Sequence, residues 1–230
     1  MYFPADVNTL LATMEKCLKD ENKVNLITAC KRELPQWFKL DEAKELVKKG
    51  YAEAEWVGTG GEDVVLVSAG DYQTNETVEA AKLLKLHVPE LGFKYINVNQ
   101  INPFGIGSES NLIDTSEKFE KVFGTHNGIV FNFHGYPEAI KQLTWDFNAA
   151  DRLKILGYLE EGTTTTAFDM EVVNKASRYH VCIEAIKLAS RINQTVAAKQ
   201  DELIKYFEDK LEEHKAYIIK HSEDMPEVRG

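Results

Sequence analysis

Two basic residues, Lys31 and Arg32, directly follow an apolar run at residues 24–29 that is predicted to be a buried strand. In open α/β sheets, ligands collect at the carboxyl ends of the strands, where this pair would lie. A lysine there carries a compact charge on a long stem, which suits a tetrahedral phosphate dianion. The pair is therefore a candidate anion site, and the alternative is a solvated basic pair at the surface.

His134 occupies an equivalent place further along the chain. It follows the predicted strand at residues 128–133 and precedes Gly135-Tyr136-Pro137. A histidine at this edge of a sheet can donate to a phosphate or move a proton. The alternative is a structural histidine whose ring is satisfied by a neighbouring carbonyl group.

The segment before a helix predicted at residues 167–175 is a glycine followed by four threonines: Gly162, Thr163, Thr164, Thr165 and Thr166. Thr166 and Asp169 have the spacing of a capping box. The free N–H groups of a helix N-terminus can also bind an anion. The loop is therefore predicted to bind an anion or to contact a partner domain, with a plain helix cap as the alternative.

A further polar pattern is a weaker candidate for a binding site. Gly70-Asp71-Tyr72, with Asn97 and Asn99 downstream, partly resembles the Gly-Asp-Gly…Asn signature that holds magnesium and the diphosphate of thiamine diphosphate. Tyr72 stands where that signature has glycine for close backbone approach, so the segment is interpreted as a strand-to-helix turn. A hydrolase that uses Asp71 and His134 is disfavoured, because the chain has no Gly-x-Ser-x-Gly nucleophile motif.

Composition narrows the class of protein. The chain has 230 residues, of which 43% are hydrophobic and 28% charged, as in globular proteins. Its net charge of −10 argues against a nucleic-acid partner, because phosphate backbones require a basic surface. No apolar run approaches the ~20 residues of a membrane-spanning helix, and no secretory signal is present, so a cytoplasmic protein without a membrane partner is expected. Three scattered cysteines give no metal or redox motif.

Strands and helices alternate from residue 64 onward. Apolar runs predict strands at residues 64–68, 95–98, 128–133 and 153–157. Helical patterns predict helices at residues 74–86, 137–143, 167–175, 178–190 and 195–219. This order predicts an α/β fold, with a mostly parallel sheet and helices on both faces.

Two local expectations concern the ends of elements. Asp114 and Glu117 have the spacing of a capping box before a short helix that ends near Phe123. The polar C-terminal segment, residues 221–230, is expected to be loosely held.

The first 50 residues show no sheet of their own. Asp6 is the predicted N-cap of a helix at residues 7–18, and the strand at residues 24–29 follows without any earlier strand. A helix at residues 41–49, closed by Gly50, has the character of a linker. Residues 1–50 are therefore predicted to be the end of an upstream α/β domain plus a linker, and residues 51–230 to be a C-terminal α/β domain.

Taken together, these segments resemble the phosphoketolase family along essentially the whole chain. The most specific match is Gly-Thr-Thr-Thr-Thr-x-Phe-Asp-Met at residues 162–170. The other matching stretches are Asn8-Thr9-Leu10-Leu11, Pro35-Gln36-Trp37, Asp41-Glu42-Ala43, Ala69-Gly70-Asp71, His134-Gly135-Tyr136-Pro137 and Pro226-Glu227-Val228-Arg229.

The resemblance implies a transketolase-like architecture, in which residues 1–50 end a pyrimidine-type thiamine diphosphate domain. The family cleaves xylulose 5-phosphate, and often fructose 6-phosphate, with inorganic phosphate to give acetyl phosphate and an aldose phosphate. It uses thiamine diphosphate and magnesium, whose sites the resemblance places upstream of residue 1. This chain alone is therefore expected to bind no cofactor or metal, to hold no catalytic residue and to be inactive.

Lys31 is the one site residue that the resemblance carries over, because it matches the family's lysine at the substrate phosphate. Cys30 stands where the family usually has glycine, and Ala167 where it usually has proline. The expected partners are the upstream domains, the sugar phosphate and inorganic phosphate, in a homo-oligomeric enzyme. The alternative is a free-standing, non-catalytic α/β interaction or regulatory domain.

Overall fold

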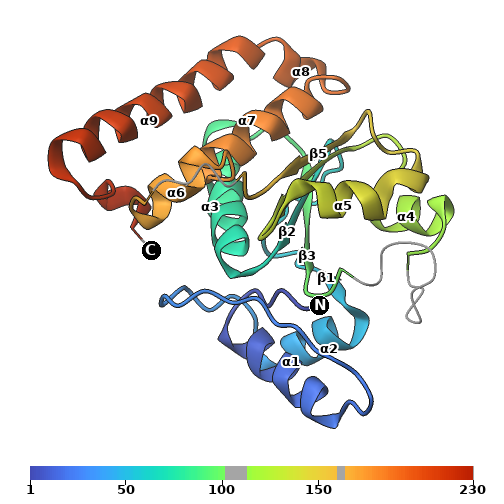
Figure 1. Cartoon of the computed structure of the whole chain (residues 1–230). Helices are drawn as coiled ribbons and strands as arrows, with labels where there is room; N and C mark the ends of the chain where they lie inside the picture. The colour runs from blue at the N-terminus through green and yellow to red at the C-terminus, as the bar shows by residue number, and fades with distance from the viewer. Residues whose placement is uncertain (102–112, 160–163, 230) are drawn as a thin grey trace.

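The computed structural model describes residues 1–101, 113–159 and 164–229, which contain a sheet of five strands in the order β1-β3-β2-β4-β5 (Figure 1). The strands are β1 (Tyr51–Glu53), β2 (Val64–Ala69), β3 (Phe93–Val98), β4 (Gly128–Phe133) and β5 (Leu153–Leu156). β1 is antiparallel to β3, and the other pairings are parallel. The predicted α/β fold is therefore confirmed, while β1 is too short to show a pattern in the sequence.

Helices cover both faces of the sheet. The described helices are α1 (Val7–Lys19), α2 (Leu40–Lys49), α3 (Asp71–His87), α4 (Ser116–Phe123), α5 (Pro137–Thr144), α6 (Ala167–Val173), α7 (Arg178–Ala189), α8 (Gln194–Ala197) and α9 (Gln200–His221). Val64 and Leu66 of β2 pack into one hydrophobic cluster with α3 and α7, whereas Val65 and Val67 pack into a second cluster with α4 and α5. Because β2 is buried on both faces, its sequence is a continuous apolar run.

Local sequence sets the ends of two helices as predicted. The Asp6 carboxylate accepts a hydrogen bond from Thr9 N at 2.8 Å, and the Thr9 hydroxyl accepts one from Asp6 N at 2.8 Å, which caps α1. Gly50 ends α2 with a φ of 84°, a left-handed conformation that favours glycine.

Two other predicted helix ends are wrong. Thr115, not Asp114, is the N-cap of α4, and its hydroxyl accepts from Lys118 N at 3.2 Å. The helix begins one residue later than its sequence suggests, and Asp114 instead forms an ion pair with Lys118 at 2.7 Å. The single helix predicted at residues 195–219 is two helices: Asn193 caps α8 through Thr195 N and Val196 N, and α9 begins at Gln200.

Residues 24–29 do not form the predicted strand. Val24 is 99% exposed, and Ile27 pairs only through one isolated bridge to Tyr2. An apolar run becomes a strand only where a sheet edge offers it a row of backbone partners, and Tyr2 offers one. Four large apolar side chains of α1 are likewise exposed, namely Val7, Leu11, Met14 and Leu18.

The C-terminal segment is docked, so the expectation of a loose tail is wrong. Helix α9 projects beyond the sheet, and the chain turns back at its end to bring the tail beside α6 (Figure 1). The tail contains a short 3-10 helix, Pro226–Val228. Met225 and Val228 are buried in the same cluster as α7, and these two apolar side chains anchor an otherwise polar segment.

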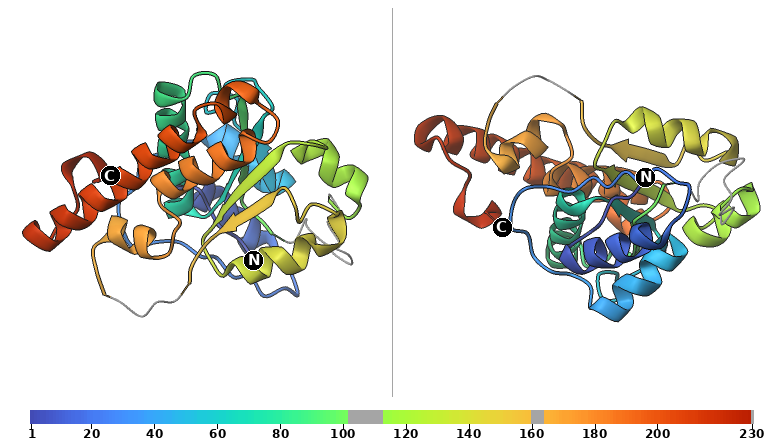
Figure 2. Two further views of the ribbon diagram at one scale, coloured as in Figure 1. Left: turned by 90° about the horizontal axis from the view of Figure 1, so that it is seen from above. Right: turned by 60° about the horizontal axis from the view of Figure 1, so that its bottom comes forward.

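Residues 1–50 share the hydrophobic core with the rest of the chain. The rings of Phe3 and Phe133 have centroids 4.9 Å apart. Phe38 and Leu46 join the cluster that contains Val64. Helices α1 and α2 pack against each other, as the right-hand view of Figure 2 shows. Contacts therefore cross the predicted domain boundary at residue 50.

Among the described residues, none of the helices combines the length and the apolar character needed to cross a membrane.

Candidate functional site

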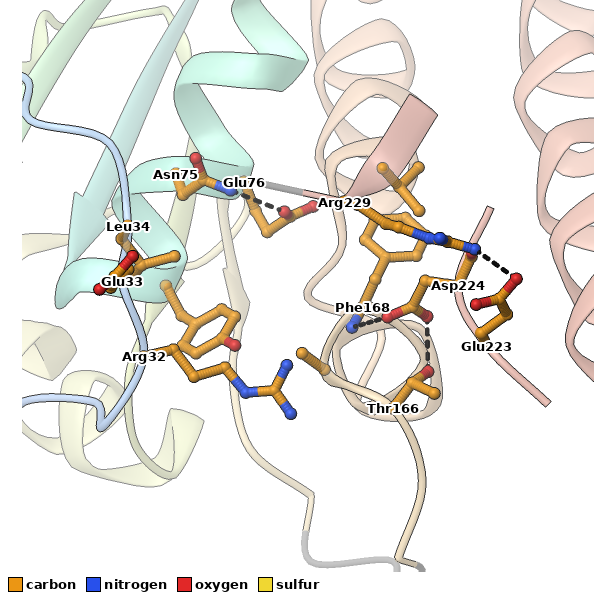
Figure 3. Close-up of a pocket in the computed structure, with 13 residues that line it drawn as sticks. Arg32, Glu33, Leu34, Asn75, Glu76, Thr166, Phe168, Glu223, Asp224 and Arg229 are labelled. Atoms are coloured by element: carbon orange, nitrogen blue, oxygen red, sulfur yellow. Dashed lines mark hydrogen bonds and ion pairs between the residues drawn. The ribbon is translucent and has the colours of Figure 1, made fainter. Parts of the chain in front are cut away.

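The carboxyl edge of the sheet carries the polar groups that the sequence singles out. Strand β2 ends at Ala69 and is followed by α3, which begins at Asp71, while β4 ends at Phe133 and is followed by His134. Figure 3 shows the chain around Arg32 passing on one side of this region and helix α6 lying on the other. The site is thus built from loops that the parallel strands hold in place, as in other open α/β sheets.

A cavity of about 410 Å³ lies between these segments. Three separate predictions from the sequence meet in its wall, because Lys31, His134, Thr165 and Thr166 all line it. Thr164 is exposed, and Gly162 and Thr163 lie outside the described residues. The fold therefore brings most of the described candidate residues to one place.

A second cavity, of about 420 Å³, adjoins the first. Arg32, Tyr72, Thr166 and Ala167 line both. In Figure 3 the guanidinium of Arg32 reaches toward α6, and Arg229 of the tail lies on the far side, where it pairs with Glu223 at 2.8 Å. The docked tail is therefore one wall of this second cavity.

Asp71 holds two parts of the site together. One carboxylate oxygen accepts from Cys30 N at 2.6 Å, next to Lys31, and the other accepts from Tyr72 N at 2.8 Å. That second oxygen also lies 3.3 Å from His134 Nδ1. Burial alone would raise the pKa of Asp71, but the contacts with His134, Cys30 N and Tyr72 N outweigh it and lower the pKa. A carboxylate so held fixes the backbone that carries Lys31 relative to the strand that carries His134.

His134 is positioned by a carboxylate and not by the carbonyl group that the simpler interpretation of the sequence suggests. Its backbone N donates to Ala69 O at 2.8 Å, which continues the pairing of β2 with β4. Gly70 makes this approach possible, because a Cβ at Gly70 would lie 2.3 Å from the Cβ of His134. Gly70 also has a φ of 106°, a backbone conformation that favours glycine. His134 also lines the first cavity.

The predicted capping box of Thr166 and Asp169 is wrong, although Thr166 is the N-cap of α6. Thr165 donates to Asp169 at 2.6 Å, whereas Thr166 donates to Asp224 of the tail at 2.5 Å. The backbone N atoms of Phe168 and Asp169 also donate to Asp224, at 3.2 and 3.3 Å. The helix N-terminus, which the sequence offered as an anion site, therefore already holds a carboxylate of the same chain.

The mouth of the first cavity is basic. Lys31 and Arg32 are both exposed there. Burial raises the pKa of Tyr72 to about 12, with Arg32 acting in the opposite direction, so this phenol is uncharged at neutral pH. Two adjacent cations can attract an anion to this place even though the molecule carries a net charge of −10.

Sequence reasoning missed the buried polar groups behind this mouth. Gln73 of α3 and Glu171 of α6 both line the cavity, and Gln73 Nε2 lies 3.1 Å from one carboxylate oxygen of Glu171. Beside them, Glu76 forms a buried ion pair with Arg178 at 2.7 Å. A single acidic residue in a helix resembles a surface residue. The available signal was the start of α3, where the polar run from Asp71 to Thr77 is almost entirely buried.

The partial cofactor signature is a strand-to-helix turn, as predicted. Asp71 is engaged by its three contacts, and Asn97 donates within a buried network to Thr74 at 2.9 Å. Asn99 donates to Thr13 at 3.2 Å. These side chains do not fit the diphosphate and magnesium of thiamine diphosphate, and we place no cofactor on them. In the described ranges, no group of three or more His, Cys, Asp or Glu is arranged to hold a metal ion.

Comparison with known proteins agrees with the resemblance seen in the sequence. Residues 31–230 match the family described as the XFP C-terminal domain. The chain is 38% identical over 240 residues to a protein named probable phosphoketolase in Brucella abortus (strain 2308) and 38% identical over 231 residues to probable phosphoketolase 2 of a Nostoc species. These alignments cover 100% and 99% of this chain, which spans 29% of the length of each of these two relatives.

A solved structure shares the fold. It is titled "Split gene transketolase, inactive beta4 tetramer", and it aligns with a TM-score of 0.61 over 82% of this chain and 57% of that chain. The two sequences are 16% identical, so this likeness concerns the architecture alone.

Proposed function

Because this chain belongs to the phosphoketolase family, in which it matches the XFP C-terminal domain, we propose that it is the C-terminal part of an enzyme that cleaves a ketose phosphate with inorganic phosphate. The substrate would be xylulose 5-phosphate, fructose 6-phosphate or both, and the products acetyl phosphate and an aldose phosphate. The observation that carries the proposal is the place of Lys31, which resembles the family's phosphate-binding lysine and lines the cavity at the carboxyl edge of the sheet.

The contribution of this chain is the binding of charge. Thiamine diphosphate, held by upstream domains, would supply the carbanion chemistry of the complete, homo-oligomeric enzyme. Lys31 binds the substrate phosphate through its ammonium group, and the hydrogen bond from Cys30 N to Asp71 fixes the loop that carries it. His134, held next to Asp71, gives the same cavity a second group that can donate to an oxyanion. No bond-breaking step is assigned to a residue of this chain.

The test is Lys31→Ala in the complete enzyme. A charge-assisted hydrogen bond contributes about 1.5–3 kcal/mol. We therefore expect kcat/KM for xylulose 5-phosphate to fall about ten- to a hundredfold. Lys31→Arg should recover only part of this loss, because the guanidinium has a different geometry. Lys23→Ala, at an exposed lysine of the neighbouring segment, is the matched control and should leave kcat/KM unchanged. A wild-type kcat/KM for Lys31→Ala would remove the proposed role of Lys31.

A free-standing binding domain is the second candidate function. The observation that favours it is the cavity itself, which has basic residues at its mouth and needs no catalytic residue of this chain to bind an anion. Addition of the upstream domains separates the two candidates. Formation of acetyl phosphate only in the mixture or the complete enzyme supports the enzyme, whereas ligand binding by this chain with no activity in either supports the binding domain.

A further inference from the structure

The C-terminal tail is tied to the start of α6 through one carboxylate. Asp224 accepts hydrogen bonds from the Thr166 hydroxyl at 2.5 Å and from the backbone N atoms of Phe168 and Asp169 at 3.2 and 3.3 Å (Figure 3). The Asp224 side chain is 12% exposed, and hydrogen bonds to a carboxylate are stronger than those between neutral groups. Three donors at the start of α6 therefore converge on one side chain of the tail.

Other contacts keep Asp224 in this place. Arg229 Nε donates to the backbone O of Asp224 at 2.8 Å, and Met225 beside it is buried. The fully buried ring of His214 in α9 has its Nε2 atom 3.7 Å from Asp224 and 3.4 Å from Asp169. The docked tail therefore sets the position of Asp224, and Asp224 in turn sets the position of the start of α6.

The hydroxyl protons of Thr165 and Thr166 are engaged by carboxylates of the chain. Thr165 donates to Asp169 at 2.6 Å, and Thr166 donates to Asp224. Because a hydroxyl has one proton to donate, neither threonine has it available for a phosphate oxygen. Both threonines nevertheless line the first cavity together with Lys31. Their contribution is therefore to shape the wall of this cavity and not to donate to an anion in it.

We propose that Asp224 is a positioning residue, which holds Thr166 and the start of α6 where the first cavity fits a phosphate group bound by Lys31. This role rests on the proposed function above, because its ligand is the phosphate of the ketose phosphate. Asp224 acts through Thr166, which lines the cavity. A tail segment that is far from Lys31 in the sequence thereby takes part in substrate binding.

Steady-state kinetics of the complete enzyme with xylulose 5-phosphate separate binding from turnover. Asp224→Ala should raise KM about tenfold, which is about the effect of one hydrogen bond to a charged group. We expect kcat to stay within about twofold, because the phosphate is bound equally in the ground state and the transition state. Asp224→Asn keeps one acceptor oxygen and should recover most of the wild-type KM.

A matched control lies in the same tail. Glu227 contacts Tyr179 and Lys210 of α7 and α9, and its side chain is half exposed. Glu227→Gln should therefore keep the wild-type KM.

A double-mutant cycle tests whether Asp224 acts through Thr166. Thr166→Val removes the hydroxyl and keeps the shape of the side chain, so KM should rise severalfold. Combined with Asp224→Ala it should raise KM no further than Asp224→Ala alone, because both changes remove the same contact. A residue that only stabilises the fold would instead lower kcat with the folded fraction.

Thermal melting verifies that each variant is folded. The proposal is overturned if folded Asp224→Ala has the wild-type KM, if the loss is in kcat, or if the two effects on KM multiply. If Asp224→Ala does not fold, Thr166→Val removes the same hydrogen bond from its other side, and a wild-type KM there overturns the proposal.

These outcomes differ from failure of the proposed function. Failure of the positioning role alone leaves kcat/KM low in Lys31→Ala and KM unchanged in Asp224→Ala. Failure of the proposed function leaves kcat/KM unchanged in Lys31→Ala.

Discussion

Glu171 is a carboxyl group that the fold keeps almost entirely from solvent, next to two other carboxylates. Burial of a charge without an opposite charge is costly, and the protein avoids this cost at neutral pH by keeping the proton on Glu171, whose pKa is raised from 4.5 to about 8. The neighbouring Glu76 differs, because Arg178 pairs with it at 2.7 Å. Of these two buried glutamates, only Glu76 has a cationic partner among the described residues.

This difference predicts how the stability of the chain depends on pH. Between about pH 4.5 and pH 8 the unfolded chain has lost the Glu171 proton, while the folded chain retains it. Since the folded state binds more protons, its stabilisation falls as the pH rises through this window, by up to about 1.4 kcal/mol per pH unit. Between pH 6 and pH 8 the loss from Glu171 should be roughly 2 kcal/mol.

Urea unfolding of the wild type and of Glu171→Gln at pH 6 and pH 8 measures this effect. The amide has no proton to lose, so the variant should gain roughly 2 kcal/mol relative to the wild type between the two pH values. Parallel behaviour of the two proteins would contradict a protonated Glu171.

At the scale of elements, the three-sided junction of α3, α6 and α7 explains how the site is kept in shape. Arg178 at the start of α7 donates to both carboxylate oxygens of Glu76 on α3, at 2.7 and 3.0 Å. The same guanidinium lies 5.2 Å from the ring centre of Phe168 on α6. One buried side chain of α7 therefore joins α3 and α6, the two helices whose residues line the two cavities.

Removal of one member of this pair should be strongly destabilising. Arg178→Met leaves Glu76 as an unpaired buried charge, so we expect a loss of about 3–5 kcal/mol in the free energy of unfolding. The double variant Glu76→Leu with Arg178→Met should recover much of that loss, because no charge stays buried. The exposed pair of Lys187 and Glu184, at 2.9 Å, is the control, and Lys187→Met should cost less than about 1 kcal/mol. Chemical denaturation of the wild type and the three variants measures these changes, and a small loss for Arg178→Met would show that Glu76 is accessible to water.

Strands were predictable from the sequence where both of their faces are buried. They were not predictable where strand formation depends on pairing with an adjacent strand. Strand β4, Gly128–Phe133, coincides with its predicted range because both faces of the strand are buried. Residues 24–29 have the same apolar character, but no adjacent strand pairs with them along their length. The sequence also directed attention to the cations and hydroxyls of the site. It did not reveal Gln73 and Glu171, whose contact joins α3 and α6, and its one signal was the polar run at the start of α3.

At the scale of the whole molecule, both ends of the chain pack against elements from its central part. The N-terminal segment places Phe3 against Phe133, at the end of β4. The C-terminal tail places Asp224 at the start of α6 and buries Val228 near α7. The two cavities thus lie between segments from the beginning, middle and end of the chain, and their shape depends on the whole fold.

The first 50 residues provide the final prediction, which tests the domain boundary proposed at residue 50. Removal of residues 1–50 takes away Phe3, Phe38 and Leu46, each almost fully buried in one of the two clusters. Burial of a large apolar side chain contributes about 1.5–3 kcal/mol, so we expect the fragment 51–230 to lose several kcal/mol of unfolding free energy relative to the whole chain. Substitution of exposed Leu18 and Val24 by serine is the control, because neither side chain is buried, and it should change stability by less than about 0.5 kcal/mol.

Thermal and urea unfolding of the three proteins decides between one core and two. If residues 1–50 and 51–230 form one cooperative unit, the whole chain unfolds in a single transition and the fragment unfolds at a lower urea concentration. If residue 50 is a true boundary, the fragment keeps the midpoint of the whole chain, because its core would be complete without Phe3, Phe38 and Leu46. The structure favours the first outcome, since Phe3 packs directly on the strand that leads to His134. Loss of the N-terminal segment should then also weaken phosphate binding, because it removes Lys31 and Arg32 together with the backbone N–H of Cys30 that Asp71 holds.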